Sequence, residues 1–338
     1  MKEKHILLAG NEFVVKMDDR RADRIARNWA YRRAIRPALR WMERGRVTNI
    51  VPGIGREPAA NFGQDLFGLP EDVPVFYPRP TSLPEETSEQ DAASKVRNHE
   101  WYHTLLVADG VLTPGLYDHA PALRHFPIPE DLSGKRCLDV ATFDGFWAFE
   151  MERRGAAEVV ALDIERWDDI DLPPYAIDDL RGQGKLGPTG SGFQIAAELL
   201  GSHVKRRICN VYDLSPDRVG RFDLVFCGDL LLHITNPLRA LQNMYSVTRG
   251  ALVLCETYAP GLDAAGLGPV AKLMGDMTGG LWWLLSKSYL QHAIQLAGFA
   301  RVEYCGTVDI RPRRGLQHAI PRAIFRAFTH PLPEGQHP

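Results

Sequence analysis

The stretch KRCLDVATFDGFWAFEMERRGAAEVVALD, residues 135–163, decides the fold. Its apolar run at residues 137–141 predicts a buried strand, and residues 142–145 predict a tight turn. Aromatic side chains at helical spacing from residue 146 predict a helix, and residues 159–163 predict a second strand. The stretch therefore forms a parallel βαβ unit, in which a ligand lies beyond the carboxyl ends of the strands, beside the N-terminus of the helix.

Further strands and helices are predicted along the rest of the chain. Two crossover helices are expected, one at residues 237–247 with Asn236 as N-cap, and one at residues 286–296 that Gly298 ends. Strands alternating with helices predict an α/β protein with a doubly wound, Rossmann-like, mostly parallel sheet. The apolar runs that predict the additional strands are residues 203–209, 222–227, 251–256 and 300–305.

Two irregular segments follow predicted strands. Residues 168–192 are rich in Pro, Gly and Asp and stand where a second crossover helix is expected. The segment after Gly261 is irregular as well. Both follow strand carboxyl ends, where a lid over a binding site belongs. We therefore predict two lid insertions, although the first is equally compatible with a loop without fixed structure.

The first 100 residues are predicted to form an extension of the main domain, which is expected to span residues 101–330. Residues 16–46 have helical spacing and many arginines, and Pro37 is expected to break this helix. Residues 51–94 are dense in Pro and Gly, which predicts a long irregular connection. The basic helix either packs on the main domain with a solvated arginine face, which we favour, or contacts RNA or lipid.

Composition and charge narrow the function classes. A net charge of −2 over 338 residues gives no global attraction to nucleic acid or to membranes. The five cysteines are widely spaced without a Cys-x-x-Cys pair, so we expect reduced core thiols. The apolar run at residues 5–9 is too short for a secretory signal, and no segment approaches membrane-spanning length. We expect a cytoplasmic protein with no membrane partner.

The turn of the opening stretch, LDVATFDG at residues 138–145, resembles motif I of the class I S-adenosylmethionine (SAM) dependent methyltransferases. In that family a strand ending in Asp-x-Gly-x-Gly-x-Gly leads into a helix and a second strand that ends in an acid. This sequence keeps Asp139 and Gly145 and has Asp163 at the end of the second strand, but Ala141 and Phe143 replace the first two glycines. SAM presents one carboxylate and one ammonium to this turn, so Ala141 is compatible with it.

Later segments resemble the family in the same order, over about residues 101–328. The resemblance implies a seven-stranded sheet whose final strand, residues 322–328, is antiparallel. The segments that carry it are residues 210–214 for adenine contact, 222–229 for the fourth strand, 230–237 for the following loop, 251–257 for the fifth strand and 297–299 before the sixth. Its strength lies in this ordered series more than in any one motif.

Within the family, the pattern is most similar to the branch of tRNA wobble-uridine methyl and carboxymethyl transferases. This likeness rests on residues 144–147, 222–233 and 298–299. In the carboxymethyl-transferring members a tyrosine precedes the loop histidine, whereas this sequence has Leu232 there. The substitution favours ordinary methyl transfer over the use of a carboxylated SAM.

The resemblance implies a set of cofactor-binding residues. Asp163 is expected to hold the ribose hydroxyls, with a surface acid or helix cap as the alternative. Asp139 is expected either to order the turn or to accept the ligand ammonium, while Asn210 and Val211 are expected beside adenine. The full expected set is Asp139, Ala141, Phe143, Asp144, Gly145, Asp163, Ile164, Asn210, Val211 and Cys227.

Methyl transfer also needs an aligned and deprotonated nucleophile. His233 is the candidate base, because the ordinary pKa of histidine suits proton removal, and Asp229 is expected to orient it or the substrate. The alternative for His233 is a helix-cap or core histidine. The expected walls of the acceptor pocket, with plain core packing as the alternative, are Trp101, Tyr102, His103, Phe143 and Trp147. Trp283 is expected to contact the substrate from the lid, with a partner surface as the alternative.

Three functions are compatible with the sequence. The favoured one is a SAM-dependent methyltransferase that acts on an oxygen or nitrogen of a small-molecule acceptor. A tRNA methyltransferase is the second, since the segment from Arg20 to Arg46 is basic. The third is a non-catalytic SAM- or nucleotide-binding protein, because the glycine pattern is broken. A homo-oligomer is compatible with the sequence, and no metal site is expected, because pairs such as Asp229 with His233 fall short of a ligand set.

Overall fold

The computed structural model describes residues 2–8, 11–17, 66–67, 89–264, 266–274, 281–310, 312–313 and 321–330. By its contacts the chain divides into two compact units. One comprises residues 1–56 and 274–282, and the other comprises residues 57–273 and 283–338. In the first unit the structure describes an antiparallel hairpin, in which β1 (Lys2–Leu8) pairs with β2 (Asn11–Met17).

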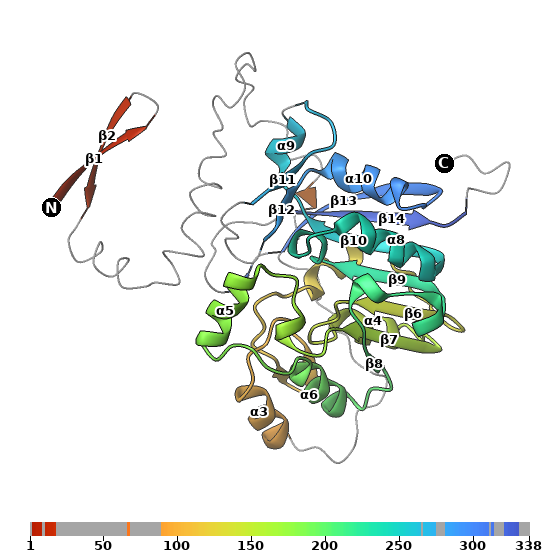
Figure 1. Cartoon of the computed structure of the whole chain (residues 1–338). Helices are drawn as coiled ribbons and strands as arrows, with labels where there is room; N and C mark the ends of the chain where they lie inside the picture. The colour runs from red at the N-terminus through yellow and green to blue at the C-terminus, as the bar shows by residue number, and fades with distance from the viewer. Residues whose placement is uncertain are drawn as a thin grey trace. The chain divides into compact units, whose positions relative to one another are not determined.

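The second unit is built on an eight-stranded sheet with the order β3-β13-β14-β10-β9-β6-β7-β8 (Figure 1). Its pairs are parallel except those of β14, which is antiparallel to both neighbours. The strands are β3 (Leu66–Phe67), β6 (Arg136–Val140), β7 (Glu158–Asp163), β8 (Lys205–Ile208), β9 (Phe222–Gly228), β10 (Thr248–Thr257), β13 (Arg301–Asp309) and β14 (Pro321–Phe328). The strand order reverses direction between β6 and β9, and the carboxyl ends of these two strands mark the ligand crevice of such sheets.

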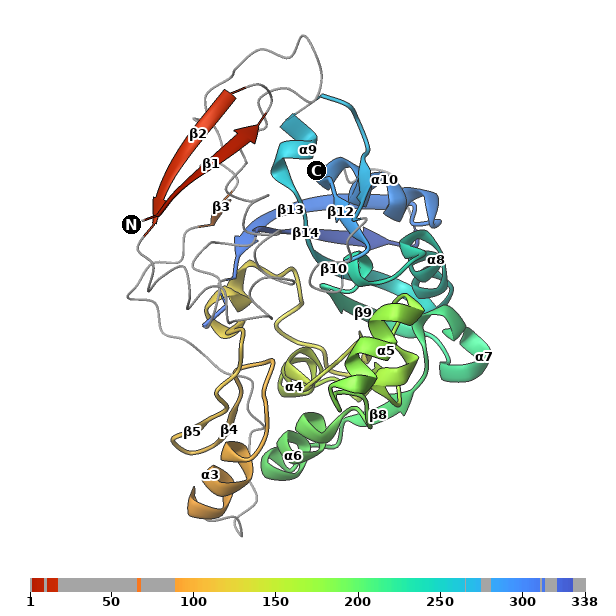
Figure 2. The same cartoon turned by 60° about the vertical axis from the view of Figure 1, so that its left-hand side comes forward.

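Helices cover both faces of the sheet (Figures 1 and 2). One face packs α4 (Phe146–Arg153), α6 (Ser191–Leu200) and α3 (Glu89–Arg97), and the other packs α7 (Pro216–Val219), α8 (Pro237–Val247) and α10 (Lys287–Leu296). Strand residues alternate between the two cores: Leu224 and Phe226 face the first, while Val225 and Cys227 face the second. The doubly wound, Rossmann-like architecture is therefore confirmed.

Helix ends follow the expected local chemistry. Asn236 accepts a hydrogen bond from the Arg239 N–H at 3.0 Å and caps α8, with Pro237 in the first turn. The Ser286 hydroxyl accepts from the Tyr289 N–H at 3.0 Å and caps α10. Both crossover helices were predicted from these residues, and both are confirmed.

The extension and the insertions depart from expectation. β3 adds an eighth strand from within the predicted irregular connection. Residues 16–17, expected to begin a helix, end β2, and the rest of that expected helix, with its arginines, lies outside the described residues. The first insertion carries η3 (Trp167–Asp169) and α5 (Pro174–Gly182). The crossover helix that was expected at its place comes after it, as α6. The second carries α9 (Pro260–Ala264) and a two-stranded pair, β11 (Ala271–Leu273) with β12 (Trp283–Leu285).

Smaller elements complete the description. A short hairpin closes at Asp109 and Gly110, with β4 (Leu106–Ala108) pairing with β5 (Val111–Leu112). Short 3₁₀ helices follow three of the strands. They are η2 (Ala120–His125) after β5, η4 (Val211–Asp213) after β8 and η5 (Leu231–His233) after β9. All five cysteines are unpaired, and four of them are buried. Among the described residues no helix has the length and apolarity that a membrane span requires.

Candidate active site

The turn between β6 and α4 keeps the backbone conformation of a glycine-rich motif, although two of its three glycine positions hold other residues. Ala141 and Phe143, which stand at two glycine positions, have φ angles of 59° and 52°. Both therefore adopt the left-handed conformation, which costs a residue with a side chain on the order of 1–2 kcal/mol. Gly145 keeps a φ of 93°, and an added Cβ there would lie 2.5 Å from the Phe149 ring. The tertiary fold thus imposes the turn that the sequence motif only partly specifies.

Asp139 organises this turn from beneath. Its Oδ2 accepts hydrogen bonds from the Thr142 hydroxyl at 2.6 Å and from the Ala148 N–H at 3.1 Å, in the first turn of α4. The side chain is 1% exposed, and burial raises the pKa of Asp139 to about 7 even though these hydrogen bonds lower it. Of the two roles expected for Asp139, these contacts correspond to the ordering of the turn.

The raised pKa of Asp139 predicts a pH-dependent stability. Below about pH 4 the carboxyl group is protonated in both the folded and the unfolded state. Between about pH 4 and pH 7 only the unfolded chain ionises, so its contribution to the free energy of unfolding falls as pH rises, by about 4 kcal/mol in total, and is constant above that range. Asp139→Asn carries no charge at any pH. Above about pH 7 its free energy of unfolding should therefore exceed that of the wild type by about 4 kcal/mol. Urea unfolding of both proteins at several pH values measures it, and a difference independent of pH would contradict the prediction.

Asp163, at the end of β7, reaches back to the same turn. Its Oδ2 accepts from the Phe143 N–H at 3.0 Å, and its Oδ1 accepts from the Ile164 N–H at 2.8 Å. Burial raises the pKa of this carboxyl group, and the two backbone hydrogen bonds oppose that shift. A carboxylate oxygen can accept more than one hydrogen bond, so Asp163 retains capacity for a ligand diol.

Asp144, in the turn, binds a segment from earlier in the chain. Its Oδ2 accepts from the Tyr102 N–H at 2.7 Å and the His103 N–H at 2.9 Å, which fastens the segment before β4 to the turn. Asp144 is 3% exposed, and burial raises its pKa to about 6. Asp144 thus docks this segment, and its expected place in the cofactor-binding set stays a prediction.

The segment after β8 lies at the next strand end. Asn210 caps η4 by accepting from the Tyr212 N–H at 3.0 Å, and the Val211 side chain is buried. The Asn243 side chain, from α8, donates to the carbonyl groups of Val211 and Tyr212 at 3.0 and 2.8 Å. The expected adenine-side segment is thus fixed against α8.

Asp229 follows β9, on the other side of the point where the strand order reverses. It has a φ of 49°, and its Oδ1 accepts from the Thr257 N–H and hydroxyl at 3.0 and 2.8 Å. Its Oδ2 accepts from Arg322 Nε at 2.5 Å, in an ion pair whose side chains are 14% and 3% exposed. Burial lowers the pKa of Arg322, but the charge of Asp229 more than offsets this and holds it above its ordinary value. Asp229 was expected to orient His233 or the substrate, yet these contacts tie it to β10 and β14.

Glu256, near the end of β10, is fully buried beside this ion pair. Its Oε1 accepts from the N–H groups of Leu230 and Leu231 at 2.9 and 3.0 Å. Its Oε2 has no hydrogen-bond partner among the described residues. Burial raises the pKa of Glu256 well above its ordinary value, and the charge of Asp229 raises it further. Through these two hydrogen bonds, the buried Glu256 supports the loop that follows β9.

His233 ends η5 in that loop and is half-buried. Both insertions contact the loop. Trp283, from β12, donates its Nε1–H to the Ile234 carbonyl at 3.0 Å, and Asp171, from the first insertion, accepts from the Thr235 N–H at 2.7 Å. The loop that carries the candidate base is thus held by Glu256 of the sheet and by one contact from each insertion.

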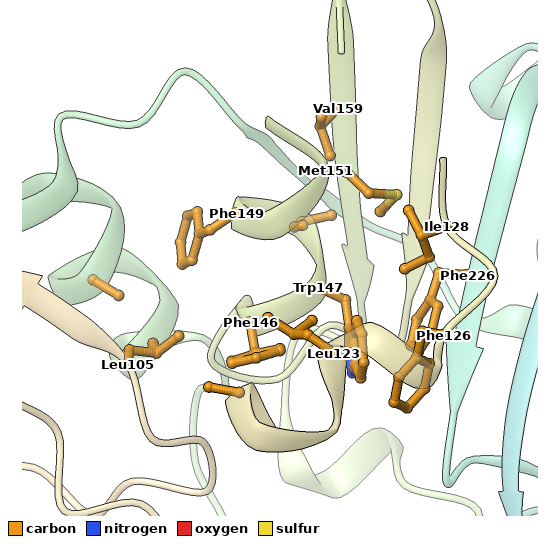
Figure 3. Packing of buried hydrophobic residues seen from close by; sticks show 14 of the residues in the cluster. Leu105, Leu123, Phe126, Ile128, Phe146, Trp147, Phe149, Met151, Val159 and Phe226 are labelled. Carbon is orange, nitrogen blue, oxygen red and sulfur yellow. The ribbon is translucent and has the colours of Figure 1, made fainter. Parts of the chain in front are cut away.

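Two tryptophans predicted to wall the acceptor pocket lie in the hydrophobic core. Trp147 packs between Phe126 and Phe226, with ring centroids 4.3 and 4.2 Å away (Figure 3). Trp101 is 6% exposed and donates its Nε1–H to the Val96 carbonyl at 2.9 Å. These positions correspond to the core alternative, because α4 and the segment before β4 turn their indole rings inward.

The Cys227 side chain, near the end of β9, is 0% exposed and packs in the core on the α8 side of the sheet. Burial raises the pKa of this thiol well above its ordinary value. The side chain therefore has a packing role, and the cofactor contact expected of Cys227 stays a prediction.

A cluster of rings lies over the turn. The Tyr102 ring is 4.8 Å from Phe143 and 5.0 Å from Tyr117, and the His103 ring is 5.1 Å from His119. Each histidine is 5% exposed, and the Nδ1 atoms of both lack hydrogen-bond partners among the described residues. Burial lowers the pKa of His103 well below its ordinary value and that of His119 to about 3. Both imidazoles are therefore neutral at neutral pH. Within this cluster of rings, the half-buried side chains are Tyr102, Tyr117 and Phe143.

This geometry agrees with the result of sequence comparison. A sequence model of the family described as "Methyltransferase domain" matches residues 117–304, more than half of the chain. The chain belongs to the methyltransferase domain family. Its sheet order and the turn after β6 identify it as a class I, SAM-dependent methyltransferase, as the sequence resemblance implied.

Individual relatives of this methyltransferase are distant. A tRNA U34 carboxymethyltransferase of Campylobacter hominis is 27% identical over 128 residues, which is 38% of this chain and 37% of that protein. The match thus spans little more than a third of the relative. Among solved structures, the SAH-bound N-terminal domain of EvdMO1 is 17% identical with a TM-score of 0.48, covering 72% of this chain and 98% of that one. The 1,6-didemethyltoxoflavin-N1-methyltransferase of Burkholderia thailandensis is 16% identical with a TM-score of 0.38, covering 58% and 71%.

The residues at the turn fit SAM. The turn that contains Ala141 and Phe143 leads directly into the N-terminus of α4, where the helix dipole favours the cofactor's carboxylate. Asp163 offers acceptor oxygens to a ribose diol from the same turn. No group of three or more His, Cys, Asp or Glu residues in the described ranges is arranged to hold a metal ion.

Several residues of this region were not identified as functional from the sequence. Arg322, Glu256, Tyr117 and His119 approach the site from strands and loops far apart in the chain. A charged residue within an apolar strand, as at Glu256 and Arg322, is the one signal that singles them out, because burial of a charge requires a partner. Their partners become visible only in the fold.

Proposed function

We propose that this methyltransferase transfers a methyl group from SAM to an oxygen or nitrogen of a small-molecule acceptor. The observation that carries the proposal is that both insertions meet at the loop after β9, through Asp171 and Trp283. Loops that converge over a strand-end crevice favour an enclosed acceptor, since an enclosed site excludes water and limits acceptor size. The roles of the individual site residues belong to this proposal.

The chain's residues divide between the two substrates. SAM, when bound, supplies an electrophilic methyl group on its sulfonium. Asp163 holds the ribose hydroxyls, Gly145 and the α4 N-terminus receive the methionine carboxylate, and Asn210 and Val211 flank adenine. His233 removes the proton from the acceptor nucleophile. Tyr102, Phe143 and Trp283, each half-buried, contact the acceptor.

The buried Leu232 bears on the form of the cofactor. Its side chain is 5% exposed and lacks the hydroxyl group expected at this position in carboxymethyl-transferring members of the branch. An apolar buried side chain cannot donate a hydrogen bond to an extra carboxylate. We therefore propose ordinary methyl transfer.

Removing the Asp163 carboxylate should abolish tight cofactor binding. We expect Asp163→Ala to weaken SAM binding by a factor of about 100 to 10,000, because two hydrogen bonds to a charged group contribute about 1.5–3 kcal/mol each. Isothermal calorimetry with SAM measures this loss. Asp168→Ala is the control, since Asp168 follows β7 in the first insertion and pairs with Arg166 at 2.8 Å. Equal affinities of the wild type and Asp163→Ala would exclude the ribose contact.

The acceptor class is tested by transfer of a labelled methyl group. The protein is incubated with methyl-labelled SAM and a cell extract that has been divided into RNA and small-molecule fractions. We expect label in the small-molecule fraction. Label confined to RNA would replace the proposal by the tRNA alternative, and binding of SAM without transfer to either fraction would indicate a non-catalytic protein.

The tRNA alternative is supported by one observation, the match to the carboxymethyltransferase. The basic residues Arg20 to Arg46 that motivated it lie outside the described residues. If tRNA is the acceptor, binding should weaken steeply with salt, since released counterions dominate affinity for nucleic acid. Reversing the charges of Arg32, Arg33 and Arg36 should then abolish it.

A further inference from the structure

Asp171, in the insertion between β7 and α6, joins loops from three strand ends. Its Oδ2 accepts from the Tyr212 hydroxyl at 2.6 Å and from the N–H and hydroxyl groups of Thr235 at 2.7 and 2.8 Å. Tyr212 follows β8 and Thr235 follows β9. One carboxylate oxygen thus connects the loops after β7, β8 and β9.

Tyr212 extends this connection to α8. Its hydroxyl group donates to Asp171 and accepts from the Asn236 N–H at 2.9 Å, and Asn236 is the N-cap of α8. Burial raises the pKa of Tyr212, and its hydrogen bond to Asp171 raises it further, so the phenol stays protonated as the donor. The guanidinium of Arg239 lies 5.6 Å from the centre of the Tyr212 ring. Hydrogen bonds to its hydroxyl group and the contact of Arg239 with its ring therefore fix the position of Tyr212.

The other end of the insertion is fastened to β8. Arg206 donates from Nη2 to the Ile164 carbonyl at 3.1 Å and to the Thr189 hydroxyl at 2.7 Å. The Thr189 N–H donates to the Glu165 carbonyl at 2.9 Å, which closes the neck of the insertion. Between neck and far end, the Trp167 ring lies 5.5 Å from Phe143, at a glycine position of the cofactor turn. The insertion thus runs from β8, past the cofactor turn, to the loop that carries His233.

We propose that Asp171 is a positioning residue: through Tyr212 and Thr235 it holds the insertion over the cofactor turn and so retains bound SAM and its product. The inference rests on the SAM site described above. The contacts are charge-assisted hydrogen bonds to one carboxylate, which are about twice as strong as neutral ones. Release of S-adenosylhomocysteine requires this node to open, and opening also frees the loop of His233.

The test measures dissociation of S-adenosylhomocysteine from the full-length protein by stopped flow. We expect Asp171→Ala to release it about tenfold faster or more, since each lost hydrogen bond to a charged group is worth about that factor. Tyr212→Phe, which deletes one hydroxyl group, should act in the same direction. The double variant should show less than the product of the two effects, because both substitutions open one node. Asp171→Asn keeps an acceptor oxygen and should restore part of the retention.

Asp178→Ala is the matched control. Asp178 lies in α5 of the same insertion, is exposed, and pairs with Arg181 at 2.6 Å. It should leave the dissociation rate unchanged. In Asp171→Ala the Michaelis constant for SAM should rise more than turnover falls. Hydrogen exchange should be faster at residues 235–236, and the melting temperature should be nearly unchanged. A merely structural role would instead lower the melting temperature of the whole domain.

The outcomes separate the two proposals. If the wild type binds S-adenosylhomocysteine and both Asp171→Ala and Tyr212→Phe release it at the wild-type rate, this inference is overturned and the cofactor assignment stands. If the wild type shows no binding heat with SAM or S-adenosylhomocysteine, both fail together. Should Asp171→Ala not fold, Tyr212→Phe gives the same decision.

Discussion

Replacing Arg322 by methionine should lower the free energy of unfolding by about 3–5 kcal/mol, because it leaves the Asp229 carboxylate in a buried site without its cation. The two side chains are 3% and 14% exposed, so water cannot replace the lost partner. The remaining hydrogen bonds from Thr257 compensate only in part. Urea unfolding at neutral pH measures the loss.

A double-mutant cycle separates this effect from packing. Asp229→Asn removes the buried charge, so the double variant Asp229→Asn/Arg322→Met should recover much of the loss seen in Arg322→Met. Arg249→Met is the matched control: Arg249 also pairs with an aspartate, Asp223, at 2.7 Å, but its side chain is 53% exposed. An exposed pair contributes about 0–1 kcal/mol. Equal losses in Arg322→Met and Arg249→Met would contradict a buried ion pair at Asp229.

Replacing His233 by alanine should lower turnover by a factor of about 100 to 10,000, the range for loss of a positioned base. The affinity for SAM should stay nearly unchanged, since the proposed cofactor residues lie on other strand ends. Calorimetry gives the affinity, and the labelled-methyl assay gives turnover.

The control for this prediction is His203→Ala. His203 is exposed, and its backbone N–H donates to Glu152 at 2.7 Å, outside the proposed site. Its turnover should equal that of the wild type. Undiminished turnover in His233→Ala would remove His233 as the base, and a parallel fall in SAM affinity would assign it to the cofactor site instead.

The order of elements was predictable from local pattern. The apolar runs, the Asn236 and Pro237 start of α8 and the opening βαβ unit all appear where the sequence placed them. Such features depend on periodicity and capping within short windows, which a single sequence contains. β3 was not predictable in this way, because a two-residue strand carries too little periodicity and depends on its neighbour β13.

Side-chain roles were less predictable than elements. Trp147 is aromatic, as residues that line pockets often are, yet its ring stacks on Phe226, 79 positions later in the sequence. Asp144 lies in the motif but holds the backbone of Tyr102 and His103. In each case the partner comes from a distant segment, so only strand order and register decide which side chains meet.

The sequence by itself determined that residues 135–163 form a strand, a turn, a helix and a second strand, because the apolar runs, the acids and the third glycine are local signals. The resemblance to the methyltransferases depended on the ordered series of later segments. Only the tertiary structure decided that Ala141 and Phe143 adopt the left-handed backbone of the missing glycines. A contact from another strand supports that conformation against its local cost, since Asp163 of β7 accepts a hydrogen bond from the Phe143 N–H. Local propensity fixes elements, whereas the conformation of a strained turn is settled by long-range partners.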